Sequence, residues 1–364
     1  MSGTWRLLAD DGAGAAEGLA LDEALMRRYA QGEPACAPTL RLYSYRDHCA
    51  LVGRYQNLQA EVDLAACRRT GADVNRRLSG GGAIVMGRGQ LGVAYLDRAR
   101  PGERPREVIE GLAAALVAGL AKLGITASFQ GKNDLEVGGR KIAGLGLYVD
   151  PTGALLFHAS VLADLDVGLM LGLLRVPAAK LEGRAVAAVA ERVTTVSAET
   201  GARHDATTLR PFIAEGFGTT FGVTLEPGAP DRAEADRARA LAASRYRSQS
   251  WLDEHSAAPD ASGSALLKTP AGLARIYLTT HGDLVKSVMV AGDFNELPPA
   301  LAAMESGLRW RRLDRKVVMA VVTGSGVADA LGVSPELVTA ALLEAGPKAG
   351  EDAVAADVTR KVGS

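Results

Sequence analysis

Cysteine is scarce in this sequence. Only Cys36, Cys49 and Cys67 occur among the 364 residues, and none follows position 67. An odd number of cysteines without the spacing of metal ligands indicates neither a disulfide framework nor a zinc motif. The sequence gives no reason to expect an oxidised, disulfide-stabilised protein.

Long apolar runs are also missing. The N-terminal stretch MSGTWRLLADDGAG has no basic segment followed by an apolar core, so it does not predict a secretory signal. The most apolar helix-like stretch, residues 111–120, is about half as long as a membrane span and consists mostly of alanine and glycine. Together with the cysteine usage, these absences favour a reduced cytoplasmic enzyme or binding protein.

The chain has no large excess of charge of either sign. Its formal net charge is −1, and 48% of its residues are hydrophobic. A near-neutral balance argues against a general nucleic-acid or membrane-surface binder, so any contact with a polyanion should be local. The length exceeds one ordinary core and suggests two domains, or at most three.

Helices and short strands alternate irregularly in the first two thirds of the chain. Apolar periodicity and capping residues predict helices at 15–31, 61–69, 105–123, 166–174 and 208–219. Strands are predicted at 40–45, 49–55, 125–130, 134–137, 141–148 and 154–162. Residues 83–86 and 90–96 are predicted to form a hairpin around the turn 87–89. This order favours an α+β domain over a regular βαβ series.

The last third of the chain predicts a second, smaller unit. The charged residues 231–247 predict a solvated helix that leads away from the first domain. Beyond it, strands are predicted at 266–270, 273–281 and 284–292, and helices at 297–307 and 325–345. We expect domains at 1–245 and 246–346, followed by a frayed tail at 347–364.

Two arginines and three glycines stand together in VNRRLSGGGAIV, residues 74–85. A tight turn would explain the glycines, since glycine accepts backbone angles that other residues avoid. The chemical explanation is that backbone without Cβ atoms lets a phosphate or carboxylate reach several N–H groups. Arg76 and Arg77 favour this explanation, because guanidinium groups bind such oxygens in a bidentate way. Strand alternation predicts that one arginine faces a site and the other a salt bridge.

A second unusual stretch is GKNDLEVGGRKIAGLGLY, residues 131–148. Asn133 and Asp134 begin a short strand, two glycines turn the chain, and Lys141 opens an apolar partner strand. One interpretation is a hairpin with exposed basic residues. The other is that Lys141 lies in a buried strand, where its ammonium group needs an anionic partner.

The two stretches together resemble the lipoate-protein ligases of the biotin/lipoate ligase superfamily. The resemblance lies in RRLSGGGA (76–83) and NDLEVGGRKIAG (133–144). The other matching stretches, in the expected order, are LALDEAL (19–25), ALVGRYQN (50–57) with Glu61, LLFHASVL (155–162) and AVAERVTTV (188–196). The resemblance covers roughly residues 1–225, and residues from 245 onward are more loosely similar to the small accessory domain of that family.

The resemblance implies an α+β fold. It implies a large catalytic domain of mixed β-sheets flanked by helices, like class II aminoacyl-tRNA synthetases and biotin synthetases, and a small α+β C-terminal accessory domain. It also implies a reaction in which lipoate, or octanoate, attacks the α-phosphorus of ATP to give acyl-AMP, and a protein lysine then takes the acyl group.

The implied partners follow from that reaction. ATP and Mg²⁺ would be needed, and the acceptor would be a dehydrogenase E2 lipoyl domain, the glycine-cleavage carrier or a specialised lipoate-binding protein. We expect a monomer without nucleic-acid or membrane contacts.

The resemblance also implies roles for individual residues. Lys141 matches the lysine that contacts the carboxylate oxygen and the α-phosphate, and it is the catalytic candidate. Asn133 and Asp134 match the pair near the phosphates, where the carboxylate of Asp134 is suited to Mg²⁺. The remaining lipoate- and adenylate-binding candidates are Arg77, Ser79, Gly80, Gly81, Gly82, Ala83, Gly144 and His158.

Three roles stay open. His158 is either a pocket-lining residue or a structural histidine, and Arg192 either contacts phosphate or pairs on the surface. Met86 and the strand 92–96 either line an apolar acyl tunnel or pack in the core.

Two departures from the family pattern concern the pocket wall. Gly92 and Val93 stand where polar residues are usual after the glycine loop, and AGLG at 143–146 replaces the commoner SGSA. These departures bear on the length of the acyl chain and on the contacts to the adenylate.

Three other functions remain open: octanoyl or lipoyl transfer without ATP, biotin ligation, and non-catalytic acyl binding. A transferase would need a cysteine facing the pocket near Lys141. No cysteine falls at the position used by that branch, and Cys49 is expected to be inert packing. Biotin ligases normally carry a GRGR-type loop and a tryptophan before the NDL segment, whereas this chain has MGRGQ (86–90) and Gly131-Lys132.

Overall fold

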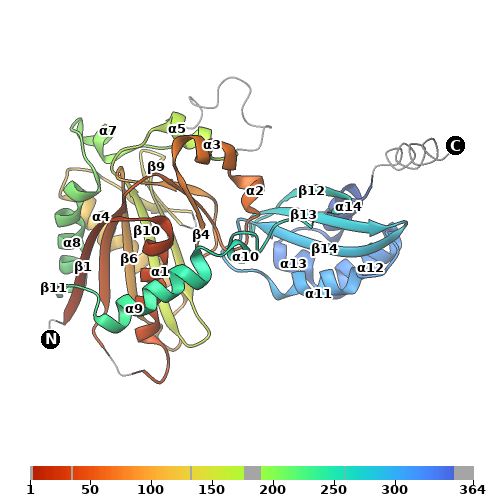
Figure 1. Ribbon diagram of the computed structural model, residues 1–364, viewed down its shortest axis with the longest axis horizontal. Helices are drawn as coiled ribbons and strands as arrows, with labels where there is room; N and C mark the ends of the chain where they lie inside the picture. The colour runs from red at the N-terminus through yellow and green to blue at the C-terminus, as the bar shows by residue number, and fades with distance from the viewer. Residues whose placement is uncertain (1–2, 34–35, 132, 176–189, 259, 348–364) are drawn as a thin grey trace. The chain divides into compact units, whose positions relative to one another are not determined.

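The computed structural model describes residues 3–33, 36–131, 133–175, 190–258 and 260–347 (Figure 1). By its internal contacts the chain divides into two compact units. The first comprises Met1–Arg54, Gln59–Ser79 and Ala83–Leu252, and the second comprises Tyr55–Leu58, Gly80–Gly82 and Asp253–Ser364. Two short segments of the N-terminal half thus belong to the second unit.

An eight-stranded mixed sheet forms the centre of the first unit (Figure 1). The strand order is β11-β1-β2-β6-β10-β9-β8-β7, in which β1 runs parallel to β11 and β2 and the other neighbours are antiparallel. The strands are β1 (Thr4–Ala13), β2 (Thr39–Tyr45), β6 (Gln90–Arg98), β7 (Ser128–Gln130), β8 (Asp134–Val137), β9 (Arg140–Val149), β10 (Ala154–Leu162) and β11 (Thr224–Gly228).

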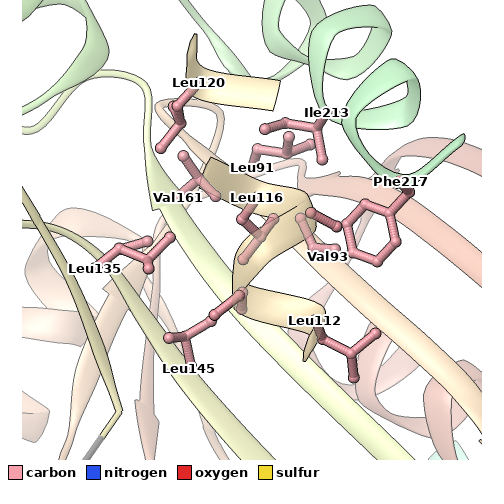
Figure 2. Close-up of a cluster of buried hydrophobic side chains, with 14 of the residues drawn as sticks. Leu91, Val93, Leu112, Leu116, Leu120, Leu135, Leu145, Val161, Ile213 and Phe217 are labelled. Atoms are coloured by element: carbon pink, nitrogen blue, oxygen red, sulfur yellow. The ribbon is translucent and has the colours of Figure 1, made fainter. Parts of the chain in front are cut away.

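Helices cover both faces of this sheet. On one face, α4 (Pro105–Ala121) and α8 (Ala206–Phe221) bury leucines and aromatic rings against β6 and β10 (Figure 2). Figure 2 shows Leu116 and Phe217 of these helices beside Val93 of the sheet. Each fully buried side chain of this kind stabilises the fold by about 1.5–3 kcal/mol. On the other face lie α1 (Ala15–Met26) and α9 (Arg232–Leu241).

The ends of α4 and α8 are set by sequence signals. Pro105 stands in the first turn of α4, where the missing N–H costs nothing. Asp205 caps α8 by accepting a hydrogen bond from the N–H of Thr208, and Gly222 ends the helix in a left-handed conformation.

A second, three-stranded sheet adjoins the large one in the first unit. Its order is β4-β3-β5, formed by β3 (Cys49–Val52), β4 (Asp73–Arg76) and β5 (Ile84–Met86). The predicted hairpin of 83–86 with 90–96 is therefore wrong, because β5 pairs with β3 while β6 lies between β2 and β10 in the large sheet. The turn 87–89 carries the chain from one sheet to the other.

Shorter helices complete this part of the chain. They are η1 (Arg27–Tyr29), α2 (Leu58–Glu61), α3 (Leu64–Thr70), α5 (Val167–Leu173), α7 (Val196–Thr200), η3 (Ala242–Tyr246) and α10 (Gln249–Leu252). The helix predicted at 231–247 is exposed on one face as expected, but the prediction that it leads away from the first domain is wrong. Helix α9 packs along α1, Leu241 is buried, and the buried carboxylate of Glu234 accepts hydrogen bonds from Arg6 at 2.8 and 2.9 Å.

In its described residues, the second unit is a three-stranded antiparallel sheet with four helices. The strands are β12 (Gly263–Lys268), β13 (Leu273–His281) and β14 (Leu284–Gly292). The helices are α11 (Pro299–Leu308), α12 (Arg315–Ser325), α13 (Val327–Leu331) and α14 (Pro335–Glu344). Helix α12 was not predicted, and the single helix predicted at 325–345 is two helices, because Gly332 adopts a left-handed conformation.

Strand alternation and helix faces build one apolar core for this unit. The predicted tail lies outside the described residues from 348 onward. None of the described helices is long and apolar enough to cross a membrane.

Candidate active site

The site is built on a row of five residues that runs across the large sheet. Strand pairing places Tyr43, Gly92, Ser160, Gly144 and Asp134 side by side on β2, β6, β10, β9 and β8. The two glycines in this row have no side chains to cover the sheet at those points. Larger neighbouring side chains therefore have room to lie over the strands.

Lys141 lies over this row. Its Nζ atom is 2.7 Å from Oδ1 of Asp134, and a Cβ atom placed on Gly144 would lie 3.1 Å from Nζ. The side chain of Lys141 is 36% exposed, so it is half-buried rather than buried as the apolar strand suggested. The anionic partner that was expected for its ammonium group is Asp134.

A narrow pocket adjoins the row on the same face of the sheet. Its volume is about 30 Å³, enough for about two water molecules. The apolar part of its wall consists of Leu19, Leu51, Leu78, Ile84, Met86, Leu156 and Ala159. The polar part consists of Asp22, Tyr43, Tyr45, Arg77, Ser79, His158, Ser160 and Tyr246. Since Ser160 pairs with Gly144, the pocket and the ammonium group of Lys141 lie over adjacent strands.

Ser79 and His158 form a pair in the pocket wall. The hydroxyl oxygen of Ser79 is 2.5 Å from Nε2 of His158. Burial, together with the positive charge of Arg77, lowers the pKa of His158 to about 3. The imidazole is therefore neutral at pH 7, where it can accept or donate a hydrogen bond but carries no charge.

Arg77 places a positive charge in the wall of this pocket. Its Nη1 donates to the carbonyl of Leu51 at 2.7 Å, and burial lowers the pKa of the guanidinium to about 10. Its planar guanidinium suits a carboxylate or phosphate oxygen that enters the pocket.

Arg76 has a different role. Its guanidinium is fully buried and donates to the carbonyls of Gly53, Arg54, Trp251 and Leu252 at 2.7–3.1 Å. It thus ties together two main-chain segments far apart in the sequence.

Several pocket residues were not singled out from the sequence. Asp22 of α1 accepts a 2.6 Å hydrogen bond from Arg41, and burial raises the pKa of its carboxyl group. Tyr43 and Tyr45 are two residues apart on β2 and so face the same side. The hydroxyl of Tyr45 is buried, and it has no hydrogen-bond partner among the described residues. In the sequence, the spacing of two tyrosines by two residues on one predicted strand was the signal that could have identified them.

The two departures from the family pattern have a steric explanation. A Cβ atom on Gly92 would lie 2.5 Å from the ring of Tyr43, and one on Gly146 would lie 2.4 Å from Nε2 of His158. Atoms do not approach so closely, so these glycines make room for the two pocket side chains. The AGLG segment therefore accommodates both His158 and Lys141.

The glycine run 80–82 belongs to the second unit by its contacts. The N–H of Gly81, whose φ is +88°, donates to the carbonyl of Phe294 at 2.9 Å. A Cβ atom on Gly80 would lie 1.9 Å from the same carbonyl oxygen. The close approach of two main chains is thus one physical reason for glycine here. Ala83 follows in the first unit.

The remaining candidates lie around Lys141 and the pocket. Asn133 accepts a hydrogen bond from the N–H of Leu145 at 2.8 Å through its carbonyl. The carbonyl of Arg192 accepts from the N–H of Lys141 at 2.9 Å, while the Arg192 side chain is exposed. Met86 lines the pocket, whereas Val93 packs in the core on the opposite face of the sheet.

The residues that could hold a metal ion are few. Among the described residues, no three His, Cys, Asp or Glu side chains are grouped so as to bind one. A nucleotide-bound Mg²⁺ needs only one or two carboxylates besides phosphate oxygens, so Asp134 is compatible with such an ion.

Comparison with known proteins decides the family. A model described as the lipoyl protein ligase A/B catalytic domain matches residues 14–218. This chain belongs to the lipoyl protein ligase A/B family. The family members it resembles include an octanoyltransferase LipM of Symbiobacterium thermophilum, which is 31% identical over 69% of this chain and 98% of the relative.

Solved structures support the same family and its class II synthetase-like fold. The bi-partite lipoate protein ligase of Thermoplasma acidophilum, studied with its E2 lipoyl domain, matches with a TM-score of 0.62 and 26% identity, over 69% of this chain and 96% of that one. A lipoate-protein ligase A bound with ATP matches with a TM-score of 0.59 and 26% identity, over 69% of this chain and 98% of the other.

Membership in the lipoyl protein ligase A/B family makes this chain an enzyme of the lipoate ligase and transferase class. The family includes relatives named octanoyltransferases as well as ligases. The choice between the two chemistries depends on the groups that this chain places at its pocket.

Proposed function

We propose that this chain is an ATP-dependent lipoate-protein ligase. It would activate lipoate, or octanoate, to the acyl-adenylate and then transfer the acyl group to a lysine of a lipoyl-domain or lipoate-binding acceptor protein. The family relationship gives the class of reaction, and the placement of the thiols favours the ligase within that class.

The thiol placement is the observation that carries the proposal. No cysteine lines the pocket in the described part of the chain. Cys49 and Cys67 are buried, and burial raises the pKa of both thiols, which disfavours the nucleophilic thiolate. Cys36, which is half-buried, packs against the core on the α1 side. A thioester route therefore lacks a nucleophile at the pocket, which favours activation of the acid by a nucleotide.

In the first step, a carboxylate oxygen of the acid attacks the α-phosphorus of ATP, and pyrophosphate leaves. Negative charge develops on the phosphorus oxygens and on the leaving group. The ammonium group of Lys141, held by Asp134 at 2.7 Å and half-exposed to the site, is available to stabilise that charge. Arg77 adds a second cation in the pocket wall.

In the second step, the neutral amine of an acceptor lysine attacks the acyl carbon of the mixed anhydride. An amide bond forms, AMP leaves with the electron pair of the broken C–O bond, and the amine loses a proton. The charge that returns to the phosphate lies again near Lys141. Ser79 and the neutral His158 would orient the acid by hydrogen bonds rather than by charge.

The pocket must widen to hold the acyl chain. Its volume of about 30 Å³ admits two water molecules but not an eight-carbon chain. The apolar part of the wall includes leucines, an isoleucine and a methionine, whose rotamers can change without breaking hydrogen bonds. These side chains would contact an aliphatic acyl chain.

Octanoyl transfer without ATP is the second candidate, because a relative 31% identical to this chain is named an octanoyltransferase. One experiment separates the two. Exchange of labelled pyrophosphate into ATP should depend on added lipoate or octanoate and should not respond to biotin. Absence of exchange, combined with acyl transfer from octanoyl-acyl carrier protein, would support the transferase.

A further inference from the structure

The loop between α11 and α12 of the second unit displays a tryptophan. Trp310 is 54% exposed, more than any other large apolar side chain in the described residues. The exposed ring leaves a large apolar surface in water, which is unfavourable in a monomer. An exposed tryptophan of this kind is a frequent anchor of protein interfaces.

The backbone at Trp310 is strained. Its φ is +59°, and it is the one residue other than glycine with positive φ among those described. A bulky residue disfavours this conformation, which persists only where its surroundings impose it. Here the N–H of Trp310 donates to the carbonyl of Val285 at 2.6 Å, and the carbonyl of Arg311 accepts from the N–H of Val285 at 2.8 Å. The loop is thus fixed on the β14 strand with its tryptophan side chain exposed.

Basic residues flank Trp310 in the sequence. Residues 309–316 contain five basic side chains and one acidic side chain, which gives a local charge of +4 in a chain whose formal net charge is −1. Arg312 pairs with Asp283 at 2.7 Å. Arg309, Arg311 and Lys316 are exposed and form no ion pair within the described part of the chain.

Two of the cations destabilise the start of helix α12. Arg315 and Lys316 occupy the first turn of α12, where the positive end of the helix dipole disfavours further positive charge. Within the second unit, the capping carboxylate of Asp314 and the carboxylate of Glu336, which interacts with the charge of Arg315, offset part of this unfavourable placement. A bound anionic partner would offset more of it.

We propose that Trp310, Arg309, Arg311 and Lys316, named here the Trp310 surface, dock an acidic face of the acceptor protein. The proposal rests on the proposed function, which requires a protein acceptor. Tryptophan and arginine are the residues most enriched among energetic anchors of protein interfaces, and arginines bind carboxylates in a bidentate way. Single-stranded nucleic acid is less well matched, because its binding sites use successive aromatic rings and this loop has one.

The test uses the full-length chain and separates the two half-reactions. Trp310→Gly removes the ring while glycine keeps the positive φ, so the loop conformation is retained. Arg309→Glu/Arg311→Glu reverses two charges. For each variant, the KM for an E2 lipoyl domain as acceptor should rise about 10- to 30-fold. Lipoate-dependent pyrophosphate exchange should be unchanged, and the KM of the wild type should rise with salt.

Matched controls come from the same unit. Leu337→Ala removes an apolar side chain that is 53% exposed, and Lys268→Glu reverses an exposed charge on β12. Neither should change the KM for the acceptor. Equal effects of controls and test variants would overturn the proposal, as would an unchanged acceptor KM in both test variants.

Two further outcomes are informative. If the variants lose binding of single-stranded DNA while their acceptor KM stays at the wild-type value, the surface serves nucleic acid and the proposal is overturned. If the wild type modifies none of the E2 lipoyl domain, the glycine-cleavage carrier and a lipoate-binding protein, the docking role is withdrawn. Pyrophosphate exchange in the same preparation then shows whether adenylation still holds.

Discussion

Lys141 and Asp134 stand on neighbouring strands of the large sheet, and Nζ of the lysine lies 2.7 Å from Oδ1 of the aspartate. The Cβ-free position of Gly144 beside them lets the lysine side chain fold over the strand. The pair holds the ammonium group in place while leaving it half-exposed. Such a group can bind an incoming anion without a rearrangement of the fold.

Replacing Lys141 by alanine should remove this charge from the site. Loss of one positioned group that stabilises transition-state charge costs about 3–4 kcal/mol, so lipoate-dependent pyrophosphate exchange should fall by about 10²- to 10³-fold. The thermal unfolding midpoint should change little, because the side chain is half-exposed. Lys122→Ala is the matched control, since Lys122 forms a surface ion pair with Glu215, and it should keep wild-type exchange. Near-normal exchange by Lys141→Ala would remove this lysine from the mechanism.

Adding one methyl group at position 146 should disturb the pocket. The Cβ of Gly146→Ala would lie 2.4 Å from Nε2 of His158, so the ring must move and its contact with Ser79 must break. The KM for lipoate should rise about tenfold or more, from the loss of a buried hydrogen bond and a displaced wall. The measurement is the lipoate dependence of pyrophosphate exchange.

Gly111 in α4 provides the control for this substitution. A Cβ there meets nothing within 4 Å, and alanine favours helix, so Gly111→Ala should keep the KM and raise the free energy of unfolding by about 0.5–1 kcal/mol. A wild-type KM in Gly146→Ala would show that the position of His158 does not matter for binding.

His158 should make the fold sensitive to acid. Its pKa is about 3 in the folded chain and about 6.5 when unfolded, so between these values the unfolded state binds the extra proton. Stability should therefore fall as pH decreases from about 6.5 toward 3, by up to about 1.4 kcal/mol per pH unit from this group. Urea unfolding at pH 7, 6 and 5 measures the slope. The slope should be shallower in His158→Gln, and identical slopes would contradict the assignment.

Arg76 should matter for stability rather than for chemistry. Arg76→Lys keeps the charge but loses the planar fork that reaches four main-chain carbonyls, so the free energy of unfolding should fall by about 2–4 kcal/mol. Chemical denaturation checks this value. Arg232→Lys, at a side chain that is 97% exposed, should have no measurable effect. An equally small effect at position 76 would mean that water replaces the lost donors.

Much of the fold was predictable from periodicity and capping. The signal at Pro105 marked the start of α4 correctly, and the helix predicted at 208–219 lies within α8. The hairpin expected around residues 87–89 was wrong, since a short turn does not reveal that its two strands enter different sheets. The helix at 231–247 was predicted to lead away from the first domain because it carries many charged residues. One of these residues, Glu234, is buried and pairs with Arg6 of the first unit.

The site was predictable where residues are close in sequence and less so where the sheet brings them together. The pairing of Lys141 with Asp134 follows from one hairpin. The pocket also needs Asp22 of α1 and Tyr43 and Tyr45 of β2, and only the pairing of β2 with β6 places Tyr43 opposite Gly92. The partition of the glycine run into the second unit was not foreseen, because it depends on the contact of Gly81 with Phe294.

The central claim is that a nucleotide, and not a thiol, activates the acid. The direct measurement is lipoate-dependent exchange of labelled pyrophosphate into ATP by a chain that carries Cys36→Ser, Cys49→Ala and Cys67→Ala. The account predicts exchange at close to the wild-type rate, because none of these thiols lines the pocket. Absence of exchange in the wild type, together with octanoyl transfer that disappears in the thiol-free chain, would contradict it.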